Sequence, residues 1–292
     1  MNDGTITWRQ LWDETATVHD RSRARWLCEE ASGAFGHEFH DVLGEPATER
    51  QVAHLDAMLA RLRTGEPLQY VLGHWSFRTL DLLVDRRVLI PRPETEWIAG
   101  EAIDHVRSLL ARGVPAPVRI ADLGTGSGAI GLSVASESPR GSVEVWLTDV
   151  SADALDVARA NLAGLGMAGG RVQVALGSWW SALPASLRGS FDVVVANPPY
   201  IELDDQRVDG SVRAWEPPGA LFAAEGGLAD VWTIVDGAAE WLVPGGLLVL
   251  EVGSGQGEAV VARCRAAGLA SAEVRPDLAG HDRMVVATHS ST

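Results

Sequence analysis

Cysteine is scarce in this chain. The two cysteines, Cys28 and Cys264, lie far apart in the sequence and lack the spacing of metal ligands. The sequence therefore gives no indication of thiol chemistry, and a chain without a disulfide framework is typical of a reducing compartment. We accordingly expect a cytoplasmic protein.

Basic residues are outnumbered by acidic ones. The chain of 292 residues has 24 Lys and Arg against 39 Asp and Glu, a formal net charge of −15. Most of such a surface would repel the phosphate backbone of a nucleic acid. The charge balance thus argues against a DNA substrate, and we expect no direct binding of nucleic acid.

Long hydrophobic runs are also missing. No apolar run has the length of a transmembrane helix, and the chain does not begin with a basic segment followed by an apolar one. Hydrophobic residues still make up 46% of the chain, which is enough to fill cores, and the length favours two domains. We expect a two-domain protein that does not bind a membrane.

The first 73 residues have a helical pattern. A helical spacing begins after Thr7, Asp20 is a candidate N-cap, and Thr48 with Gln51 forms a capping-box pattern. Apolar residues recur at helical spacing behind these caps: Trp8, Leu11, Trp12, Ala24, Trp26, Leu27, Leu55 and Met58. We predict a small helical bundle domain over residues 1–73, with its tryptophans in the core.

A short connector follows the bundle. Trp75 and Phe77 alternate with polar residues, and Leu80 and Leu82 lie two positions apart in the same stretch. Such alternation predicts a β-hairpin. We expect residues 74–93 to form a structured linker.

Residues 94–292 alternate between helical and strand-like segments. A helix is predicted over 94–112, followed by strands at 118–122, 143–148, 172–176, 191–196, 247–252, 271–275 and 284–288. Helical segments separate the first five strands, as a parallel doubly wound sheet requires. The short segment from Pro276 to Arg283 predicts that the last two strands form an antiparallel hairpin. The predicted fold class is α/β, with a seven-stranded Rossmann-like sheet.

A glycine-rich turn joins the first predicted strand to a helix. It reads Asp122-Leu123-Gly124-Thr125-Gly126-Ser127-Gly128, and its alternate glycines let the backbone turn tightly and approach a ligand closely. Asp122 would repel a pyrophosphate but could pair with the amino group of an amino-acid moiety. Asp149 ends the next strand, where a ribose-binding carboxylate is expected. These features together predict a site for a nucleotide-like cofactor.

Asn197-Pro198-Pro199-Tyr200, directly after the strand-like run 191–196, is the most informative stretch. Prolines fix φ and offer carbonyls without competing N–H donors, and Asn197 adds a side-chain carbonyl oxygen. Two such acceptors can hold both hydrogens of a planar NH2 group and aim its lone pair, while the ring of Tyr200 packs against the flat group. The motif predicts a methyl acceptor site; the alternative is an ordinary proline-rich turn.

Taken together, these motifs resemble those of the peptide chain release factor N5-glutamine methyltransferases, which use S-adenosylmethionine. The resemblance runs from about Glu66 to the C-terminus and includes the segments 66–70, 89–96, 216–221 and 244–251. It implies the class I methyltransferase form of the Rossmann-like sheet. It also implies S-adenosyl-L-methionine as the cofactor, and we expect no metal.

The resemblance assigns roles to individual residues. Those implied in cofactor binding are Asp122, Gly124, Thr125, Gly126, Ser127, Gly128, Asp149, Trp179 and Asn197. Those implied in substrate binding are Asn197, Pro198, Pro199 and Tyr200, of which Asn197, Pro198 and Tyr200 are the catalytic candidates. Trp179 is expected to pack against the adenine. The chain departs from the family at Ser178, where an Asp commonly accepts from the adenine amino group; a hydroxyl can still accept.

Positioning, rather than acid–base chemistry, is the predicted means of catalysis. A carboxamide nitrogen is a poor nucleophile because its lone pair is delocalised into the carbonyl, and the sequence offers no obvious strong base. A sulfonium methyl donor is already reactive, so in-line placement and loss of conjugation supply much of the rate. Glu94, Glu96 and Glu251 are interpreted as structural residues at helix starts and strand ends.

The leading hypothesis is a monomeric enzyme that methylates the glutamine of the Gly-Gly-Gln loop of a release factor, with residues 1–73 docking the substrate. A glutamine methyltransferase of a ribosomal protein shares the same loop chemistry and stays an alternative. An adenine-N6 DNA or RNA methyltransferase is a third reading, because adenine also presents a conjugated NH2 group, but the acidic charge disfavours it. A cofactor-binding scaffold without activity is a fourth.

Overall fold

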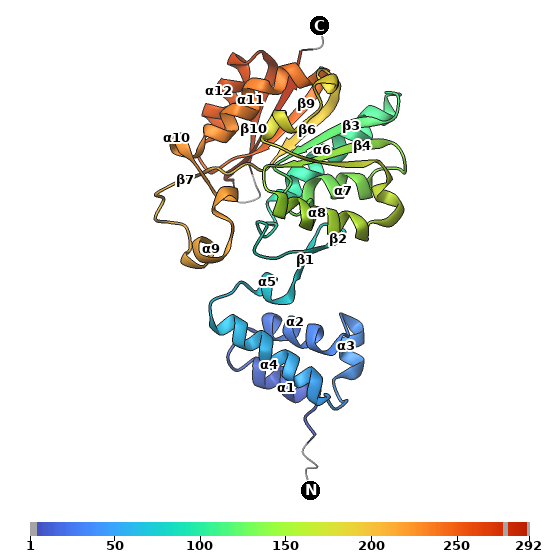
Figure 1. The fold of residues 1–292 in the computed structure, drawn as a ribbon, viewed down its shortest axis with the longest axis vertical. Helices are drawn as coiled ribbons and strands as arrows, with labels where there is room; N and C mark the ends of the chain where they lie inside the picture. Colours follow the sequence, from blue (N-terminus) through green and yellow to red (C-terminus); the bar gives the residue numbers. More distant parts are fainter. Residues whose placement is uncertain (1–4, 277–279, 291–292) are drawn as a thin grey trace. The chain divides into compact units, whose positions relative to one another are not determined.

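The chain divides into two compact units, Met1–Gly73 and His74–Thr292, in the computed structural model (Figure 1). The structure describes residues 5–276 and 280–290. The middle of the predicted loop from Pro276 to Arg283 falls at residues 277–279, outside the described residues.

The N-terminal unit is built of short helices. They are α1 Trp8–Thr15, α2 Arg21–Ser32, α3 His37–Val42, α4 Glu49–Arg63 and α5 Leu68–Leu72. The caps predicted at Asp20 and Thr48 are confirmed: Asp20 accepts a hydrogen bond from the backbone of Arg23 at 2.9 Å, and Thr48 forms a capping box. Thr7 also forms a capping box, at the start of the first helix. Since an N-cap side chain contributes about 1 kcal/mol, the local sequence determines where these helices begin.

The core of this unit contains two of the three predicted tryptophans. Trp8 and Trp12 are buried and pack edge-on against the ring of Phe39, with centroid distances of 6.3 and 6.1 Å. The prediction was wrong for Trp26, which is 42% exposed. The buried stripe of α2 runs through Ala24, Leu27, Cys28 and Ala31. Trp26 lies one position before Leu27 and therefore about 100° around the helix from it.

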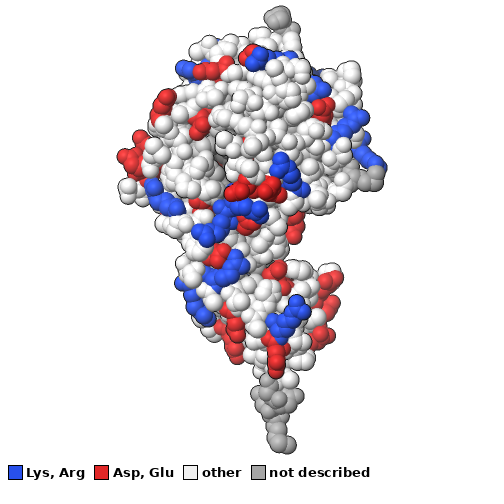
Figure 2. Space-filling view, in the orientation of Figure 1, with Lys and Arg blue, Asp and Glu red and all other residues white. Residues whose placement is uncertain are grey.

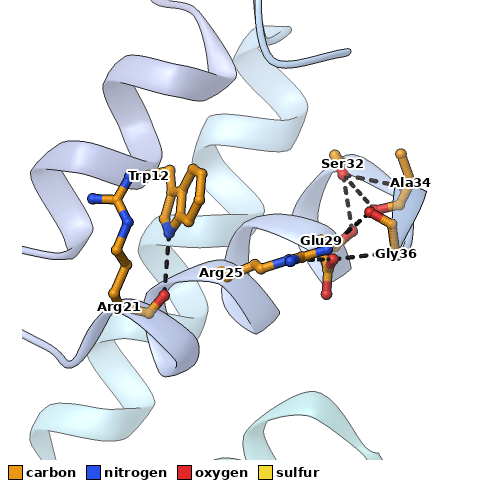
Figure 3. Close-up of polar contacts among 7 residues, drawn as sticks. All are labelled: Trp12, Arg21, Arg25, Glu29, Ser32, Ala34 and Gly36. Carbon is orange, nitrogen blue, oxygen red and sulfur yellow. Dashed lines mark hydrogen bonds and ion pairs between the residues drawn. The ribbon is translucent and has the colours of Figure 1, made fainter. Parts of the chain in front are cut away.

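Glu29 ties the end of α2 to the turn that follows it (Figure 3). Its carboxylate accepts hydrogen bonds from Nε of Arg25 at 2.8 Å and from the backbone of Gly36 at 3.1 Å. Ser32 accepts from the backbone of Ala34 in the same turn. The side chain of Glu29 is nearly buried, so these partners offset the desolvation of its charge.

The second unit begins with the predicted hairpin, which is confirmed. β1 His74–Phe77 pairs antiparallel with β2 Leu80–Leu83, and Phe77 and Leu82 are buried. Asn161 holds the hairpin because its side chain accepts from the backbone of Leu83 at 2.7 Å and donates to the carbonyl of the same residue at 3.1 Å.

A seven-stranded mixed sheet forms the centre of the second unit. Its strands are β3 Val118–Leu123, β4 Val143–Asp149, β5 Val172–Leu176, β6 Phe191–Ala196, β9 Leu242–Glu251, β10 Leu269–Pro276 and β11 Asp282–His289. The order is β10-β11-β9-β6-β3-β4-β5, in which β11 is antiparallel to both neighbours and the other pairs are parallel. The predicted strands and the antiparallel final hairpin are confirmed. β9 starts earlier than predicted, because the pairing with β6 is irregular and accommodates the sequence Pro244-Gly245-Gly246 inside the strand.

Helices cover both faces of the sheet, as the doubly wound prediction requires (Figure 1). One face packs against α6 Thr95–Ala111, α7 Ala129–Glu137 and α8 Ala152–Gly164, and the other against α11 Ala229–Trp241 and α12 Gly257–Ala266. Alternate residues of each strand face the two cores: Val193 and Val195 belong to the first, and Val194 to the second. No helix in the described part of the chain is long and apolar enough to span a membrane.

Smaller elements lie between β6 and α11 and between the main strands. They are β7 Ile201–Glu202, α9 Gly210–Trp215, β8 Phe222–Ala223, α10 Ala224–Gly227, and 3-10 helices at Gly166–Arg171, Trp179–Ala182, Ala185–Leu187 and Pro218–Ala220. β7 and β8 pair in parallel as a separate two-stranded sheet. This sheet follows the Asn-Pro-Pro-Tyr motif directly and so anchors its far end.

Candidate active site

A cavity of about 420 Å³ lies at the carboxyl ends of the parallel strands. Ligands of open α/β sheets bind at this edge. The sequence-predicted site residues that line the cavity are Gly124, Thr125, Gly126, Ser127, Asp149, Trp179, Asn197 and Pro199. The sequence-predicted residues outside its lining are Asp122, Gly128, Pro198 and Tyr200. The fold therefore brings together most of the predicted site from the four connections that follow β3, β4, β5 and β6.

The glycine-rich turn between β3 and α7 depends on its glycines. Gly124, Gly126 and Gly128 have φ values of 72°, 55° and 88°, in the left-handed region that favours glycine. A Cβ atom at Gly124 would come within 3.1 Å of the indole ring of Trp179. Because glycine has no side chain, the turn at Gly124 and the indole of Trp179 can lie in contact and line the cavity together.

Asp149 holds this turn at the end of β4. Its carboxylate accepts hydrogen bonds from the backbone of Gly126 and of Ser151, each at 2.9 Å. Burial raises the pKa of Asp149, and these backbone donors oppose the rise. Each oxygen keeps a further lone pair, so the carboxylate can accept from a ligand in the cavity.

Asp122 lies behind the turn instead of in the cavity, which corrects the expectation that it pairs with a ligand amino group. It is 1% exposed, and its Oδ2 accepts from the hydroxyl of Thr125 at 2.6 Å and from the backbone of Gly131 at 2.9 Å. Burial raises the pKa of Asp122 to about 6. The sequence could not distinguish the two positions, because an acid before a glycine turn can face either the ligand or the interior. Asp122 is a support for the turn.

Trp179 follows β5, and its ring lies against Gly124 of the glycine-rich turn. Its backbone has a φ of 46°, unusual for a residue with a side chain, and its indole nitrogen donates to Oδ1 of Asp230 at 3.0 Å. Ser178 and Asp230 both line the cavity beside it. The indole is thus held in place by the hydrogen bond that it donates to Asp230 in the first turn of α11.

The Asn-Pro-Pro-Tyr motif follows β6, as predicted, and two side-chain networks fix it. Nδ2 of Asn197 donates to the hydroxyl of Thr95 at 3.2 Å, and that hydroxyl donates to Oε2 of Glu251 at 2.6 Å. The hydroxyl of Tyr200 donates to Oε1 of Glu251 at 3.1 Å. Gln256 donates to the carbonyl of Tyr200 at 3.0 Å. The motif is therefore a fixed loop with a buried carboxylate behind it.

The expected packing of Tyr200 against a flat substrate group is not what the geometry provides. Tyr200 is absent from the cavity lining, and its hydroxyl is directed to Glu251. Burial raises the pKa of the tyrosine hydroxyl, and the neighbouring carboxylate raises it further. The phenol stays protonated and serves as a donor to Glu251.

Several cavity residues were missed as functional residues in the sequence. They are Arg87, Val88, Leu89, Pro91, Thr95, Pro217, Gly219, Ala220 and Asp230. Most fall in the segments 89–96 and 216–221, which carried the family resemblance but had no assigned role. Glu216 joins the two segments, because its buried carboxylate accepts from the backbone of Ile90 and pairs with Arg92. Among the described residues, no cluster of three or more His, Cys, Asp or Glu side chains is arranged to hold a metal ion.

The fold and the site define a class I methyltransferase. A solved S-adenosylmethionine-dependent methyltransferase from Agrobacterium tumefaciens has the same fold, with a TM-score of 0.50 and 17% identity over 75% of this chain and 71% of that chain. A family profile described as "Methyltransferase small domain" matches residues 98–214, and one described as "PrmC N-terminal domain" matches residues 13–73.

Two curated relatives specify the family further. The release factor glutamine methyltransferase of Salmonella typhimurium is 40% identical over 277 residues, which are 94% of this chain and 93% of the relative. The protein of the same name from Burkholderia pseudomallei is 41% identical over 272 residues, 92% of each chain. The chain belongs to the release factor glutamine methyltransferase family, as its motifs predicted.

Proposed function

We propose that this protein transfers a methyl group from S-adenosylmethionine to the side-chain amide nitrogen of a glutamine in a peptide chain release factor. The observation that carries the proposal is the position of Asn197, which lines the cavity and has its Nδ2 engaged by Thr95. Its Oδ1 is left as an acceptor, which is the group needed to hold an NH2. The names of the relatives support the choice of substrate.

The residues around the cavity fit the proposed cofactor. Asp149 would accept hydrogen bonds from ribose hydroxyls, because its carboxylate lines the cavity and is held by the backbone of Gly126 and Ser151. Trp179 would pack against the adenine, and the glycine-rich turn would approach the amino-acid moiety. When bound, the cofactor supplies an activated methyl group on a sulfonium.

The protein's part in the reaction would be to hold the glutamine amide. Asn197 Oδ1, which lines the cavity, would accept one of its N–H hydrogens. The backbone carbonyl of Pro198 would accept the second, although Pro198 itself is outside the cavity lining, and the two acceptors together would direct the nitrogen lone pair into the cavity. These acceptors would bind more strongly as positive charge develops on nitrogen, so they favour the transition state over the ground state. The amide nitrogen held in this way would take up the methyl group that the bound cofactor supplies, and it would then release one proton.

Residues 1–73 would dock the substrate protein. This unit has its own hydrophobic core, which includes Trp8, Trp12 and Phe39, and a family profile of its own covers residues 13–73. A separate folded unit is suited to contact a folded substrate away from the methylated residue.

Methyl transfer to defined acceptors tests the proposal. Purified protein and radiolabelled S-adenosylmethionine would be incubated separately with release factor, ribosomes and DNA, and each product digested to locate the label. We expect N5-methylglutamine in the release factor alone, lost when its Gly-Gly-Gln glutamine is replaced. Label in a ribosomal protein or in adenine would assign the alternative substrate instead, and no labelled product would contradict the activity.

A further inference from the structure

We propose that Thr95 and Glu251 are positioning residues that fix which end of the Asn197 side-chain amide faces the glutamine. The inference rests on the proposed function and adds to it a specificity device, which discriminates a glutamine side chain from a glutamate. It is carried by a chain of three side chains from α6, β9 and the loop after β6.

The geometry of this chain is direct. Thr95 is the first residue of α6, and its hydroxyl lies 2.6 Å from Oε2 of Glu251 and 3.2 Å from Nδ2 of Asn197. Glu251 is the last residue of β9 and is 1% exposed. Its other oxygen accepts from the hydroxyl of Tyr200. Glu251 is absent from the cavity lining and so acts only through its partners.

The direction of the hydrogen bonds follows from what each group can donate. An ionised carboxylate only accepts, so the single hydroxyl hydrogen of Thr95 is committed to Glu251. The hydroxyl oxygen of Thr95 is then an acceptor toward Asn197, and only the NH2 end of the amide can face it. A flipped Asn197 would place two oxygen lone pairs against each other. The carbonyl end of Asn197 is therefore directed away from Thr95.

Burial disfavours the charged form of Glu251, and its hydrogen-bond donors support that form. Burial raises its pKa, while Thr95, Tyr200 and the charge of Arg283 oppose the rise, and Glu94 adds to it. The carboxylate also lies at the N-terminus of α6, since it accepts from the first residue of that helix. The positive end of the helix dipole stabilises a negative charge there. The two hydroxyl donors satisfy one lone pair on each oxygen.

The consequence for the substrate is selectivity by hydrogen-bond polarity. An acceptor at Asn197 holds the NH2 of a glutamine but faces a glutamate carboxylate with like polarity. A flipped Asn197 would present N–H groups and would accommodate the glutamate. A site built to pair with one polar group discriminates strongly against an analogue that cannot pair. Fixing Asn197 from behind thus selects the amide side chain.

The experiment compares release factor with a variant whose Gly-Gly-Gln glutamine is replaced by glutamate. The glutamine protein is the methylated substrate, and the glutamate protein is a competitive inhibitor. Thr95→Val keeps the shape of the side chain and removes the hydroxyl. We expect Thr95→Val to lower the ratio of the inhibition constant of the glutamate protein to the KM of the glutamine protein by about 10-fold, the scale of one lost hydrogen bond. Thr95→Ser keeps the hydroxyl and should retain the wild-type ratio.

Glu251→Gln is the second variant, because a glutamine can donate to Thr95 and so permits the reversed chain. We expect Glu251→Gln to lower the same ratio, although the side chain of Glu251 does not line the cavity. Calorimetric titration with S-adenosylhomocysteine confirms that each variant is folded. An unchanged ratio in both Thr95→Val and Glu251→Gln would overturn the inference. Failure of the wild-type protein to methylate release factor would instead overturn the proposed function, on which the inference depends.

A different observation leads to a second inference, which concerns the adenine side of the cavity and also rests on the proposed function. Asp230 lines the cavity, and its Oδ1 is the partner of the Trp179 indole at 3.0 Å. Hydrogen bonds from other described residues to its Oδ2 are absent. The carboxylate of Asp230 thus lies beside the indole of Trp179, which we expect to pack against the adenine. Ser178 occupies the position where the family commonly has an acid. We infer that Asp230 accepts the adenine amino group in this chain.

Binding of two product analogues tests this assignment without turnover. S-adenosylhomocysteine carries an amino group on its purine, and S-inosylhomocysteine carries a carbonyl oxygen at the same position. We expect the wild-type protein to prefer the amino form, and Asp230→Asn to reduce that preference about 10-fold, since an amide can turn its N–H group to the carbonyl. Ser178→Ala is the matched control and should reduce the preference less. Equal preference in the wild type and Asp230→Asn would assign Asp230 to holding Trp179 alone.

Discussion

Asn197 is expected to act through one atom, its carbonyl oxygen. Replacing it with alanine removes the acceptor but leaves the glycine-rich turn and Asp149 intact. We expect Asn197→Ala to lower the rate of methyl transfer by about 100-fold or more, the scale of one preorganised polar partner, with cofactor affinity nearly unchanged. Single-turnover methylation at saturating S-adenosylmethionine is the measurement.

Asn197→Asp is the matched variant, because a carboxylate also accepts hydrogen bonds and has nearly the same shape. It cannot donate to Thr95 when ionised, so the contact at 3.2 Å becomes one between two acceptors. We expect partial activity. Full activity in Asn197→Ala would mean that the Asn-Pro-Pro-Tyr loop is a turn without a catalytic role.

Asp149 is expected to supply charge-assisted hydrogen bonds to the cofactor. Asp149→Ala also removes the acceptor of the Gly126 backbone, so the turn loses a support together with the ribose contact. We expect a loss of roughly 2–4 kcal/mol in the binding free energy of S-adenosylhomocysteine, measured by calorimetric titration. Unchanged affinity would show that the ribose is held by other residues.

Asp122 makes stability depend on pH. Burial raises its pKa to about 6 from a usual value of 3.8, so between these values the folded state holds a proton that the unfolded state releases. The free energy of unfolding therefore falls as pH rises through this window, by about 3 kcal/mol in total. Below the window both states are protonated, and above it both are charged.

Asp122→Asn removes this titration while keeping an oxygen for Thr125 and Gly131. We expect the decrease in unfolding free energy between pH 4 and pH 7 to be smaller in the variant by about 2 kcal/mol. Denaturant titrations of both proteins across this range give the comparison, and carboxylates common to both cancel. Parallel pH curves would show that Asp122 is charged throughout.

The turn before α11 acts as one structural element with the Asn-Pro-Pro-Tyr loop. Glu225, Gly226 and Gly227 all have left-handed φ values, of 56°, 67° and 83°. A Cβ atom at Gly227 would lie 2.1 Å from the carbonyl oxygen of Tyr200, whereas one at Gly226 would meet nothing within 4 Å. A side chain would be strained at either glycine, but only one at Gly227 would also meet Tyr200 and, at 3.1 Å, Nε2 of Gln256.

Gly227→Ala is therefore expected to displace the loop that carries Asn197, and Gly226→Ala is its matched control. Backbone strain alone should destabilise both by about 1–2 kcal/mol. We expect Gly227→Ala to lower methyl transfer at least 10-fold more than Gly226→Ala, because a shift of an ångström at a positioning group has an effect of that size or larger. Similar rates for the two variants would show that the contact of Gly227 with Tyr200 does not position the Asn-Pro-Pro-Tyr loop.

Helices and strands whose limits depend on neighbouring residues could be predicted from the sequence. Contacts between residues that are distant in the sequence could not. The caps at Thr7, Asp20 and Thr48 and most strand limits depend on neighbouring residues. The start of β9 was missed because Pro244-Gly245-Gly246 is a turn signal that pairing with β6 overrides. Trp26 was wrongly predicted to be buried because it lies next to the apolar stripe of α2 without belonging to it.

The candidate site divides in the same way. Asp149 and Asn197 follow strands directly, so the rule for open sheets locates them. Thr95 and Glu251 are 156 positions apart in the sequence, and they meet because α6 packs against the sheet face that includes β9. A single sequence carries no local signal for a contact of that range. The contact between Thr95 and Glu251 could therefore be identified only from the structure.

The charge of the whole molecule combines an acidic excess with arginine as its only strongly basic side chain. All 24 Lys and Arg positions are arginine, and the chain has no lysine. On the face drawn in Figure 2, arginine side chains lie among acidic ones, so its positive charge is interleaved with negative charge. Arginine stays charged at any practical pH. Titration of the surface between pH 4 and 8 therefore comes from carboxylates and histidines.

The division of the chain into two units leads to a prediction for the whole molecule. Each unit has its own hydrophobic core, so deletion of residues 1–73 should leave the second unit folded. If the first unit docks the substrate protein, its contacts stabilise the complex with intact release factor and are absent for a short peptide that carries Gly-Gly-Gln. We expect the deletion to reduce kcat/KM for the intact factor at least 10-fold more than for the peptide, since docking contributes binding energy only to the larger substrate. Steady-state methylation of both substrates by both proteins gives the ratio, and retained activity on the peptide is the control for folding. Equal losses on the two substrates would contradict a docking role for residues 1–73.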